Sequence, residues 1–108
     1  MPAAVNKEEG VPVQSADTEP PALEFEGVSK FFFQGKRRIA ALQEVSICIA
    51  RGRITGLIGP DGAGKTTLMR LSACLLKPAV GAITVLDIDA ISEPLKVQAS
   101  IGYMPQRF

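Results

Sequence analysis

The stretch that decides the fold reads Gly59-Pro60-Asp61-Gly62-Ala63-Gly64-Lys65-Thr66, near the middle of a chain of 108 residues. It fits the pattern G-x-x-x-x-G-K-T, in which a glycine-rich loop leads into a helix and holds phosphate groups. Glycine permits backbone conformations that side chains forbid, so amide N–H groups can approach phosphate oxygens closely. These amides form an anion-binding nest, to which the following helix adds its positive N-terminal end. The stretch therefore predicts a site for the phosphates of a nucleoside triphosphate.

Three side chains after the glycines complete this predicted site. Lys65 carries a mobile positive charge that can reach the β- and γ-phosphates. The Thr66 hydroxyl is placed to ligate Mg²⁺, and Thr67 can bond on the α-phosphate side. The alternative is a glycine-rich turn that only caps a helix. It gives no reason for a lysine followed by two threonines.

The residues on both sides of the loop fit a strand–loop–helix unit. Ile54 to Ile58 is a short apolar run bounded by glycines, which is typical of a fully buried parallel strand. Residues 65–76 contain no proline or glycine, and their leucines recur at helical spacing. Pro78 follows, as expected just beyond a helix C-terminus. We predict a buried strand at 54–58 and a helix at 65–76.

The N-terminal part of the chain divides into a tail and a strand-rich region. Residues 1–22 hold four prolines and several acids without apolar periodicity, which predicts a disordered tail. Residues 23–28 indicate a first strand, with its register disturbed at Gly27. Residues 45–49 alternate as a half-buried strand does, and residues 30–38 are expected to form the turn before them.

Beyond the predicted helix, short elements follow one another closely. Gly81 introduces a strand at 83–86. Ser92 is expected to cap a short helix at 92–99, with a proline in its first turn. A last strand is predicted at 101–104.

Composition excludes several classes of function. The 12 basic and 11 acidic residues give a net charge of +1, which argues against a general nucleic-acid binder. The chain has no histidine, so histidine-based acid–base catalysis and histidine-ligated metals are excluded. Cys48 and Cys74 lack metal-ligand spacing and are interpreted as small core residues of a reducing compartment. No apolar run reaches the length of a membrane span.

Several protein families use this phosphate loop, and the sequence before it helps to choose among them. In nucleotide kinases and small GTPases the loop usually follows the first strand, whereas strand-like sequence precedes it in this chain. This arrangement resembles the nucleotide-binding domain of ATP-binding cassette (ABC) transporters. The matching stretches, in the order and spacing of that family, are Val28-Ser29-Lys30-Phe31-Phe32, Ala41-Leu42-Gln43-Glu44-Val45-Ser46, residues 59–68, Leu76-Lys77-Pro78 and Ile101-Gly102-Tyr103-Met104-Pro105-Gln106.

The resemblance covers residues 23–108 and implies an α/β fold. The expected architecture is an incomplete P-loop NTPase of the ABC type, with an antiparallel β subdomain and the first part of the parallel-sheet core. ATP with Mg²⁺ is then the implied ligand. The sequences of these motifs are most similar to those of bacterial exporters of drugs, polysaccharides or similar cargo.

The resemblance assigns roles to two positions outside the loop. An aromatic residue shortly after Val-Ser-Lys stacks on adenine in this family, and Phe32 fits that spacing best. Phe31 and Phe33 are alternatives for the stacking ring, and a purely structural role for all three in the sheet stays open. Gln106 matches the family's Q-loop glutamine, which contacts Mg²⁺ and the attacking water and relays the state of ATP to the membrane domain.

Motifs of the second half of an ABC domain do not occur in this sequence. These are the signature Leu-Ser-Gly-Gly-Gln, a Walker B strand ending in Asp-Glu, and the switch histidine. Asp87 imitates Walker B, but it comes soon after the loop and Ile88 rather than glutamate follows it. We expect residues 23–108 to be the N-terminal half of such a domain, truncated just after Gln106. Such a chain would bind MgATP weakly and would not hydrolyse it detectably on its own.

The resemblance also implies partners. A transmembrane permease subunit or domain and a second nucleotide-binding domain are expected, and no nucleic acid. The chain would lie in the cytoplasm, on the cytoplasmic face of the inner membrane when assembled, as an ATP-binding subunit that powers export. The alternatives are a non-transport ABC ATPase, a non-catalytic remnant that binds only nucleotide or partner subunits, and a small-molecule kinase.

Overall fold

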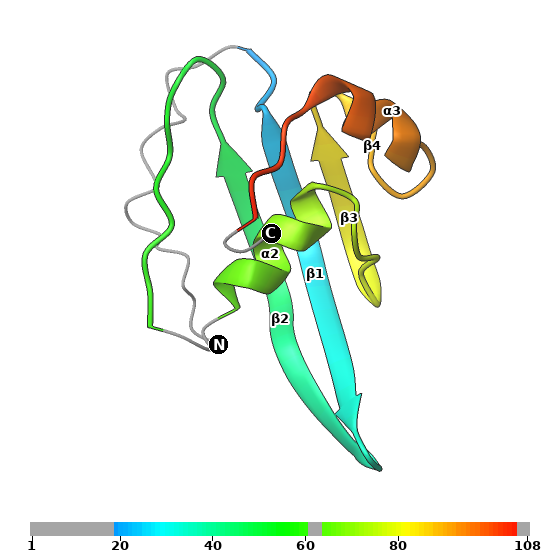
Figure 1. Ribbon diagram of the computed structural model, residues 1–108. Helices are drawn as coiled ribbons and strands as arrows, with labels where there is room; N and C mark the ends of the chain where they lie inside the picture. Colours follow the sequence, from blue (N-terminus) through cyan, green and yellow to red (C-terminus); the bar gives the residue numbers. More distant parts are fainter. Residues whose placement is uncertain (1–18, 61–63, 106–108) are drawn as a thin grey trace.

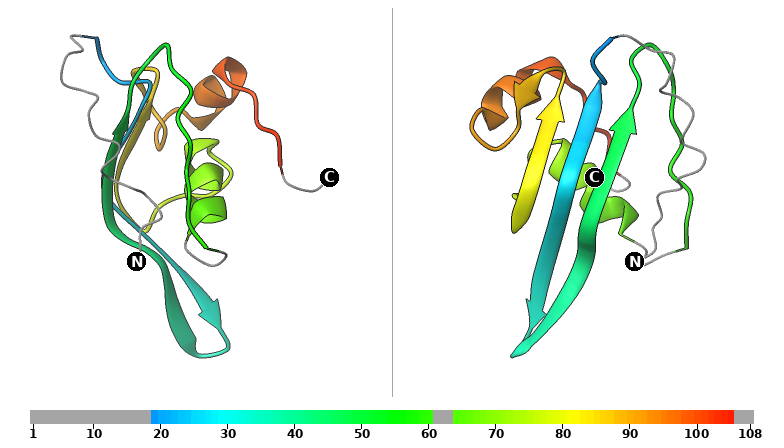
Figure 2. Two further views of the ribbon diagram at one scale, coloured as in Figure 1. Left: turned by 90° about the vertical axis from the view of Figure 1, so that its left-hand side faces the viewer. Right: turned by 180° about the vertical axis from the view of Figure 1, so that it is seen from behind.

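The computed structural model of the protein describes residues 19–60 and 64–105. Within them, four strands form one antiparallel sheet in the order β2-β1-β3-β4, and α2 and α3 lie on the same side of it (Figures 1 and 2). The elements are β1 (Leu23–Gln34), β2 (Arg37–Ile49), α2 (Lys65–Ser72), β3 (Val80–Val85), β4 (Ile88–Asp89) and α3 (Pro94–Ser100).

A long hairpin of β1 and β2 is the largest part of the sheet. Its strands pair from Leu23 with Ile49 out to Gln34 with Arg37, so the turn consists only of Gly35 and Lys36. The predicted turn at 30–38 is therefore wrong. Aromatic side chains favour a pleated strand over a turn, and the three phenylalanines extend β1 instead of ending it.

Irregular register in this hairpin confirms the disturbance expected at Gly27. Gly27 has φ of 59° and Glu44 on β2 has φ of 48°. Two hydroxyls bond the backbone where the ladder is interrupted: the Gly27 N–H donates to Ser46 Oγ and the Glu44 N–H to Ser29 Oγ, both at 2.9 Å. Because both N–H groups have a hydroxyl acceptor, the bulges leave neither of these two amides unpaired.

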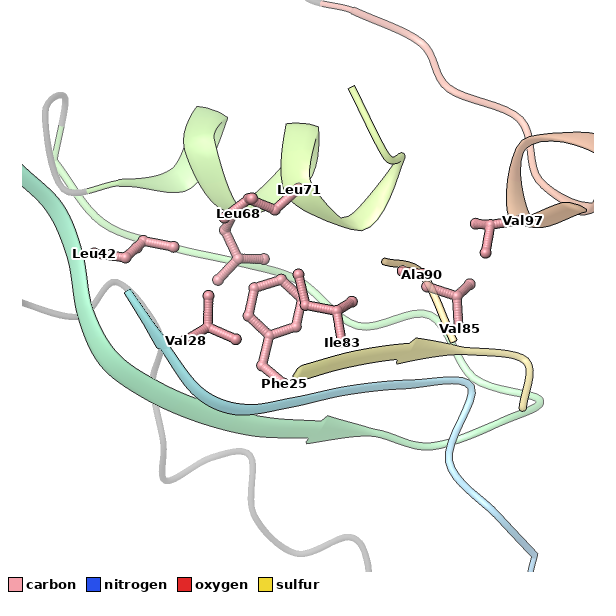
Figure 3. Packing of buried hydrophobic residues seen from close by; sticks show 9 residues of the cluster. All are labelled: Phe25, Val28, Leu42, Leu68, Leu71, Ile83, Val85, Ala90 and Val97. Carbon is pink, nitrogen blue, oxygen red and sulfur yellow. The ribbon is translucent and has the colours of Figure 1, made fainter. Parts of the chain in front are cut away.

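The hydrophobic core lies between the sheet and α2 (Figure 3). Leu68 and Leu71 of the helix point toward Phe25, Val28 and Ile83 on the strands. Burying each leucine contributes about 1.5–3 kcal/mol. The buried cluster consists of Phe25, Val28, Leu42, Leu68, Leu71, Ile83, Val85, Ala90 and Val97.

Helix α2 is shorter than the sequence predicted. It ends at Ser72 rather than at Leu76, and Cys74 adopts φ of 63°. This left-handed residue turns the chain, so Leu76 packs against the core while Leu75 is 52% exposed. The predicted burial of leucines is therefore confirmed for Leu68 and Leu71 on the helix and in part for Leu76 beyond it, and it is wrong for Leu75.

The apolar run at 54–58 does not form the predicted buried parallel strand. These residues follow an unpaired path alongside the sheet, with Ile54 fully exposed and Ile58 82% exposed. A parallel strand is buried only when neighbouring strands flank it and helices cover it. No described strand pairs with this segment, and the sheet formed by residues 19–60 and 64–105 is the antiparallel part of the expected fold.

Two further predictions near the C-terminal end also differ from the structure. The α3 helix begins at Pro94 with Glu93 at the N-cap, so Ser92 does not cap it. Proline suits the first helical position because the N–H that it lacks would be unpaired there. Residues 101–104 are extended but pair with no strand, so the last predicted strand is wrong.

Candidate nucleotide-binding site

The N-terminal end of α2 offers backbone amides to an anion. Gly64 precedes the helix with φ of 97°, and its carbonyl accepts the first helical hydrogen bond, from the Leu68 N–H at 2.9 Å. Among the described residues, no side chain caps this end, and no acidic residue lies in the first turn. The first amides and the positive end of the helix dipole are therefore available to a phosphate group.

Lys65 reaches back over the start of the glycine-rich loop. Its ammonium donates to the carbonyl oxygen of Gly59 and, at 2.8 Å, to that of Pro60. These two hydrogen bonds hold the positive charge of Lys65 at the start of the loop, close to the N-terminal end of α2. Thr66 is exposed and Thr67 half-buried in the first turn. Asp61, Gly62 and Ala63 lie outside the described residues.

The face of β1 that carries Phe32 is the face that α2 covers. Side chains alternate along a strand, so Lys30 and Phe32 point to the same side as the buried Val28. Lys30 Nζ donates to the carbonyl of Lys77, just beyond α2, at 2.8 Å, and lies 5.5 Å from the centroid of the Phe32 ring. Phe32 is 41% exposed, so part of this side chain remains accessible beside Lys30.

Phe31 and Phe33 point to the opposite face of the hairpin. Arg38 covers the Phe31 ring, with Cζ 4.3 Å from its centroid, and Phe33 is 70% exposed. The outer hairpin extends beyond the N-terminal end of α2 and bends toward the side on which the helix lies (Figure 2). This geometry favours Phe32 among the three candidates for a base-stacking ring.

The stretches around α2 that prompted the family resemblance meet in space. The Ala79 N–H donates to the Ser29 carbonyl at 2.8 Å, which joins the segment after α2 to β1. Lys30 and Lys77 add the second link described above. These contacts fix the far end of α2 relative to the hairpin.

Gln106 lies outside the described residues, so its place relative to Lys65 and Thr66 stays a prediction. The preceding segment is described: Ile101 packs against the core and Tyr103 is half-buried. Sequence reasoning missed Gln98, whose amide bonds two backbone carbonyls just after α2. No motif marks this residue, because its partners are main-chain atoms.

Asp87 is not at the candidate site. It lies in the turn between the antiparallel strands β3 and β4 and pairs with Arg51 at 2.9 Å. Arg51 also donates to the carbonyl of Pro20 at 2.9 Å. The prediction that Asp87 only imitates a Walker B residue is confirmed, because Walker B requires the end of a buried parallel strand.

Residues 19–60 and 64–105 contain no group of three or more histidine, cysteine, aspartate or glutamate side chains that could hold a metal ion. No helix among them has both the length and the apolar character needed to cross a membrane.

Comparison with known proteins identifies the family. The family model described as ABC transporter matches residues 42–108. The chain is 52% identical over 68 residues to the probable multidrug ABC transporter ATP-binding protein YbhF of Escherichia coli (strain K12), covering 63% of this chain and 12% of YbhF. It is 44% identical over 92 residues to the methionine import ATP-binding protein MetN 2 of Rhodococcus jostii (strain RHA1), covering 82% of this chain and 27% of MetN 2.

Solved structures agree with this assignment. The dimeric post-hydrolysis structure of an ATP-binding cassette bound to ADP and Pi matches with a TM-score of 0.65 and 29% identity, over 70% of this chain and 34% of that chain. The protein belongs to the ABC transporter family, and its fold is part of an ABC ATP-binding cassette. The chain spans about a third or less of the length of each of these proteins.

Proposed function

We propose that this chain binds MgATP as part of the ATP-binding subunit of an ABC transporter. One observation carries the proposal: the Lys65 ammonium lies on the loop carbonyls of Gly59 and Pro60 beside the N-terminal end of α2. A lysine charge, free helix amides and a helix dipole converge there. This combination suits the β- and γ-phosphates of a nucleotide.

Each residue of the loop has a physical role in this proposal. Lys65 exchanges its two carbonyl acceptors for phosphate oxygens when nucleotide binds. The backbone N–H groups of the loop residues other than Pro60, which has none, and those of the first helical turn donate to the phosphates. Thr67, half-buried beside the loop, donates on the α-phosphate side.

The residues present fit a magnesium ion bound together with the phosphates. The Thr66 hydroxyl is exposed in the first turn of α2 and supplies one oxygen ligand. Magnesium takes its remaining ligands from phosphate oxygens and water, since it binds through few protein oxygens in such sites. The ion neutralises phosphate charge, and Gln106 is proposed as a second contact to it and to the attacking water.

Phe32 is proposed to hold the adenine ring. Its side chain is partly accessible, on the same face of β1 as the buried Val28, and the adjacent Lys30 lies over its ring as a cation–π partner. A base that stacks on Phe32 would be anchored at one end of the nucleotide while Lys65 anchors the other.

The finer biological role rests on the relatives. We propose residues 1–22 as a tail and residues 23–108 as the N-terminal part of a nucleotide-binding domain on the cytoplasmic face of the membrane. A transmembrane permease and a second ATP-binding domain are the proposed partners. Export is proposed from the multidrug relative YbhF, while MetN 2 is named as an import protein, so the direction needs its own test.

Competition among nucleotides tests the proposal. A fluorescent ATP analogue is bound to the chain in the presence of Mg²⁺ and displaced with ATP, ADP or AMP. Since charge-assisted hydrogen bonds to the lost phosphates are worth about 1.5–3 kcal/mol each, AMP should compete at least about tenfold less well than ATP. Equal competition by AMP would show that the phosphate loop does not select the ligand.

We also expect no detectable ATP turnover by this chain alone. The sequence lacks an Asp-Glu pair at the end of an apolar strand, and phosphoryl transfer to water needs a group that positions the attacking molecule. Release of phosphate from ATP is the measurement. Turnover that Lys65→Ala abolishes would contradict this expectation.

A further inference from the structure

The C-terminal end of α2 is held by a side chain from another helix. Beyond Ser72 the chain closes the helix with backbone bonds from Cys74 to Leu71, at 3.1 Å, and from Leu75 to Arg70, at 2.9 Å. The carbonyls of Ala73 and Cys74 both accept from Nε2 of Gln98, at 3.2 Å each. Gln98 belongs to α3, which is 25 positions further along the chain from Ala73.

Glutamine suits this place for a chemical reason. The primary amide carries two N–H donors on one nitrogen, and two carbonyl acceptors lie beside each other at the helix end. The negative end of the helix dipole also favours a donor here. Both donors of Gln98 are therefore used on the same structure, the terminus of α2.

An open surface pocket of about 240 Å³ lies at the junction that Gln98 bridges, lined by Ala73, Leu75, Gln98, Ile101 and Tyr103. On the core side, Val97 of α3 is fully buried in the same cluster as Leu71 of α2. The two hydrogen bonds of Gln98 therefore add a polar connection beside this apolar packing.

The position of Gln98 in the chain links two parts of the candidate site. Helix α2 begins with Lys65 and Thr66 at the phosphate loop and is about 12 Å long, at 1.5 Å per residue over its eight residues. Gln98 donates its two hydrogen bonds to carbonyls at the other end of this helix. Two residues later α3 ends at Ser100, and the chain continues directly into the segment 101–105.

We propose that Gln98 is a positioning residue that connects α2 to the segment 101–105, so that nucleotide on the phosphate loop orders this segment. The proposal rests on the proposed function, because it needs nucleotide to bind at the start of α2. A nucleotide that pulls on the first turn of α2 displaces or stiffens the helix as a unit. Gln98 passes this change to α3 and to residues 101–105.

Hydrogen exchange by mass spectrometry of the 108-residue chain tests the proposal. Gln98→Met keeps the length of the side chain and removes both donors, while Gln98→Arg restores donation to the two carbonyls. Lys96→Met is the matched control, an exposed position on the same helix whose ion pair with Glu93 is long, at 3.8 Å. Each variant is measured alone and with Mg²⁺ and a non-hydrolysable ATP analogue, and its nucleotide affinity is measured separately.

Without nucleotide, Gln98→Met should raise exchange at residues 73–76 and 101–105 together, by about tenfold for the loss of two neutral hydrogen bonds. With nucleotide, wild type and Lys96→Met should show slower exchange at 101–105. Gln98→Met should lose this response while its affinity for the analogue changes less than about twofold, and Gln98→Arg should regain it. A residue with only a structural role would not separate the response from affinity.

The outcomes distinguish this proposal from the one on which it rests. If the analogue binds and Gln98→Met keeps the full response at 101–105, Gln98 does not connect the two parts and the inference is wrong. If the analogue does not bind to wild type, the proposed function fails, and the nucleotide response falls with it. The exchange measured without nucleotide still reports whether Gln98 holds residues 73–76 to 101–105.

Discussion

At Gly81 the packing of the sheet leaves no room for a side chain. An added Cβ would lie 2.5 Å from the Gly27 carbonyl oxygen and 2.6 Å from the Val28 Cα, and the backbone has φ of +100°. The obstructing atoms are main chain of the neighbouring strand β1, so they cannot rotate away. The close approach of β3 to the bulge in β1 therefore requires glycine.

Gly81→Ala should destabilise the chain by about 2–4 kcal/mol, since overpacking and left-handed backbone strain add. Gly52→Ala is the matched control: its φ is +73°, but nothing lies within 4 Å of the added Cβ. That variant should cost only the strain, about 1 kcal/mol. Urea unfolding measures both, and equal losses would show that the contact with Gly27 does not limit the structure.

Cys48 illustrates how strand alternation overrides a composition-based expectation. It was predicted as a core residue, but it is exposed on β2 between the inward Ile47 and Ile49. Partial desolvation raises the pKa of its thiol, and the negative charges of Glu24 and Glu26 raise it further. The stability linked to this thiol is thus present below its ordinary pKa and lost as the pH rises through the raised pKa.

Alkylation of Cys48 should therefore reach half its maximal rate above the ordinary pKa of a cysteine. The measurement uses iodoacetamide on a Cys74→Ala background. The double change Glu24→Gln and Glu26→Gln should lower that midpoint without bringing it fully back, because desolvation is the larger cause. A midpoint that does not move would exclude the two carboxylates as a cause.

At the scale of elements, the register of the hairpin formed by β1 and β2 places Phe32 and its two neighbours on opposite faces, and Phe32 is the proposed adenine contact. Phe32→Ala should weaken ATP binding by about 1–2 kcal/mol, from the lost stacking, and weaken triphosphate binding alone much less. Phe33→Ala removes a more exposed ring from the opposite face and is the matched control. Titration of ATP and inorganic triphosphate against each variant measures this, and a larger loss in Phe33→Ala would reverse the assignment.

The sequence predicted strands and helices correctly where the apolar pattern of a segment has neighbouring elements against which its apolar side chains pack. The alternation at 45–49 and the leucines at 68 and 71 found strands and a helix, because Phe25, Val28 and Ile83 supply the surface they bury against. The pattern failed at 54–58, since burial of that run depends on neighbours that no described strand provides. The C-terminal end of α2 was also predicted wrongly, because Cys74 adopts a left-handed conformation that its residue type does not indicate.

The candidate site was predicted from sequence in its chemistry more than in its geometry. Lys65, Thr66 and Thr67 follow from the loop motif alone. The preference for Phe32 over its two neighbours required the strand register and the position of Lys30. The contacts of Gln98 could not be predicted from sequence, because its acceptors are backbone carbonyls, which every residue type carries.

At the scale of the whole molecule, the segment 54–58 exposes two isoleucines, while Leu57 between them packs against the core. Ile54 is fully exposed and Ile58 82% exposed, on extended backbone without a strand partner. Such segments pair with other chains. The chain should therefore self-associate as its concentration rises, which light scattering after size exclusion measures.

Replacing both isoleucines, with Ile54→Lys and Ile58→Lys, should shift the chain toward monomer. Thr55→Lys is the control, because it adds charge to the same segment without removing an apolar side chain. If the control acts as strongly as the double variant, charge alone explains the effect. A wild-type chain that stays monomeric at every concentration would contradict the prediction.

Binding of ATP phosphates by the loop before α2 should depend on the charge of Lys65. Calorimetric titration with MgATP is carried out on wild type, Lys65→Ala and Arg70→Ala, the last being an exposed basic residue in the final turn of the same helix. Lys65→Ala should weaken binding by about tenfold or more, since it removes a charge-assisted contact, while Arg70→Ala should leave the affinity within about twofold. Equal affinity of Lys65→Ala and wild type would contradict the account.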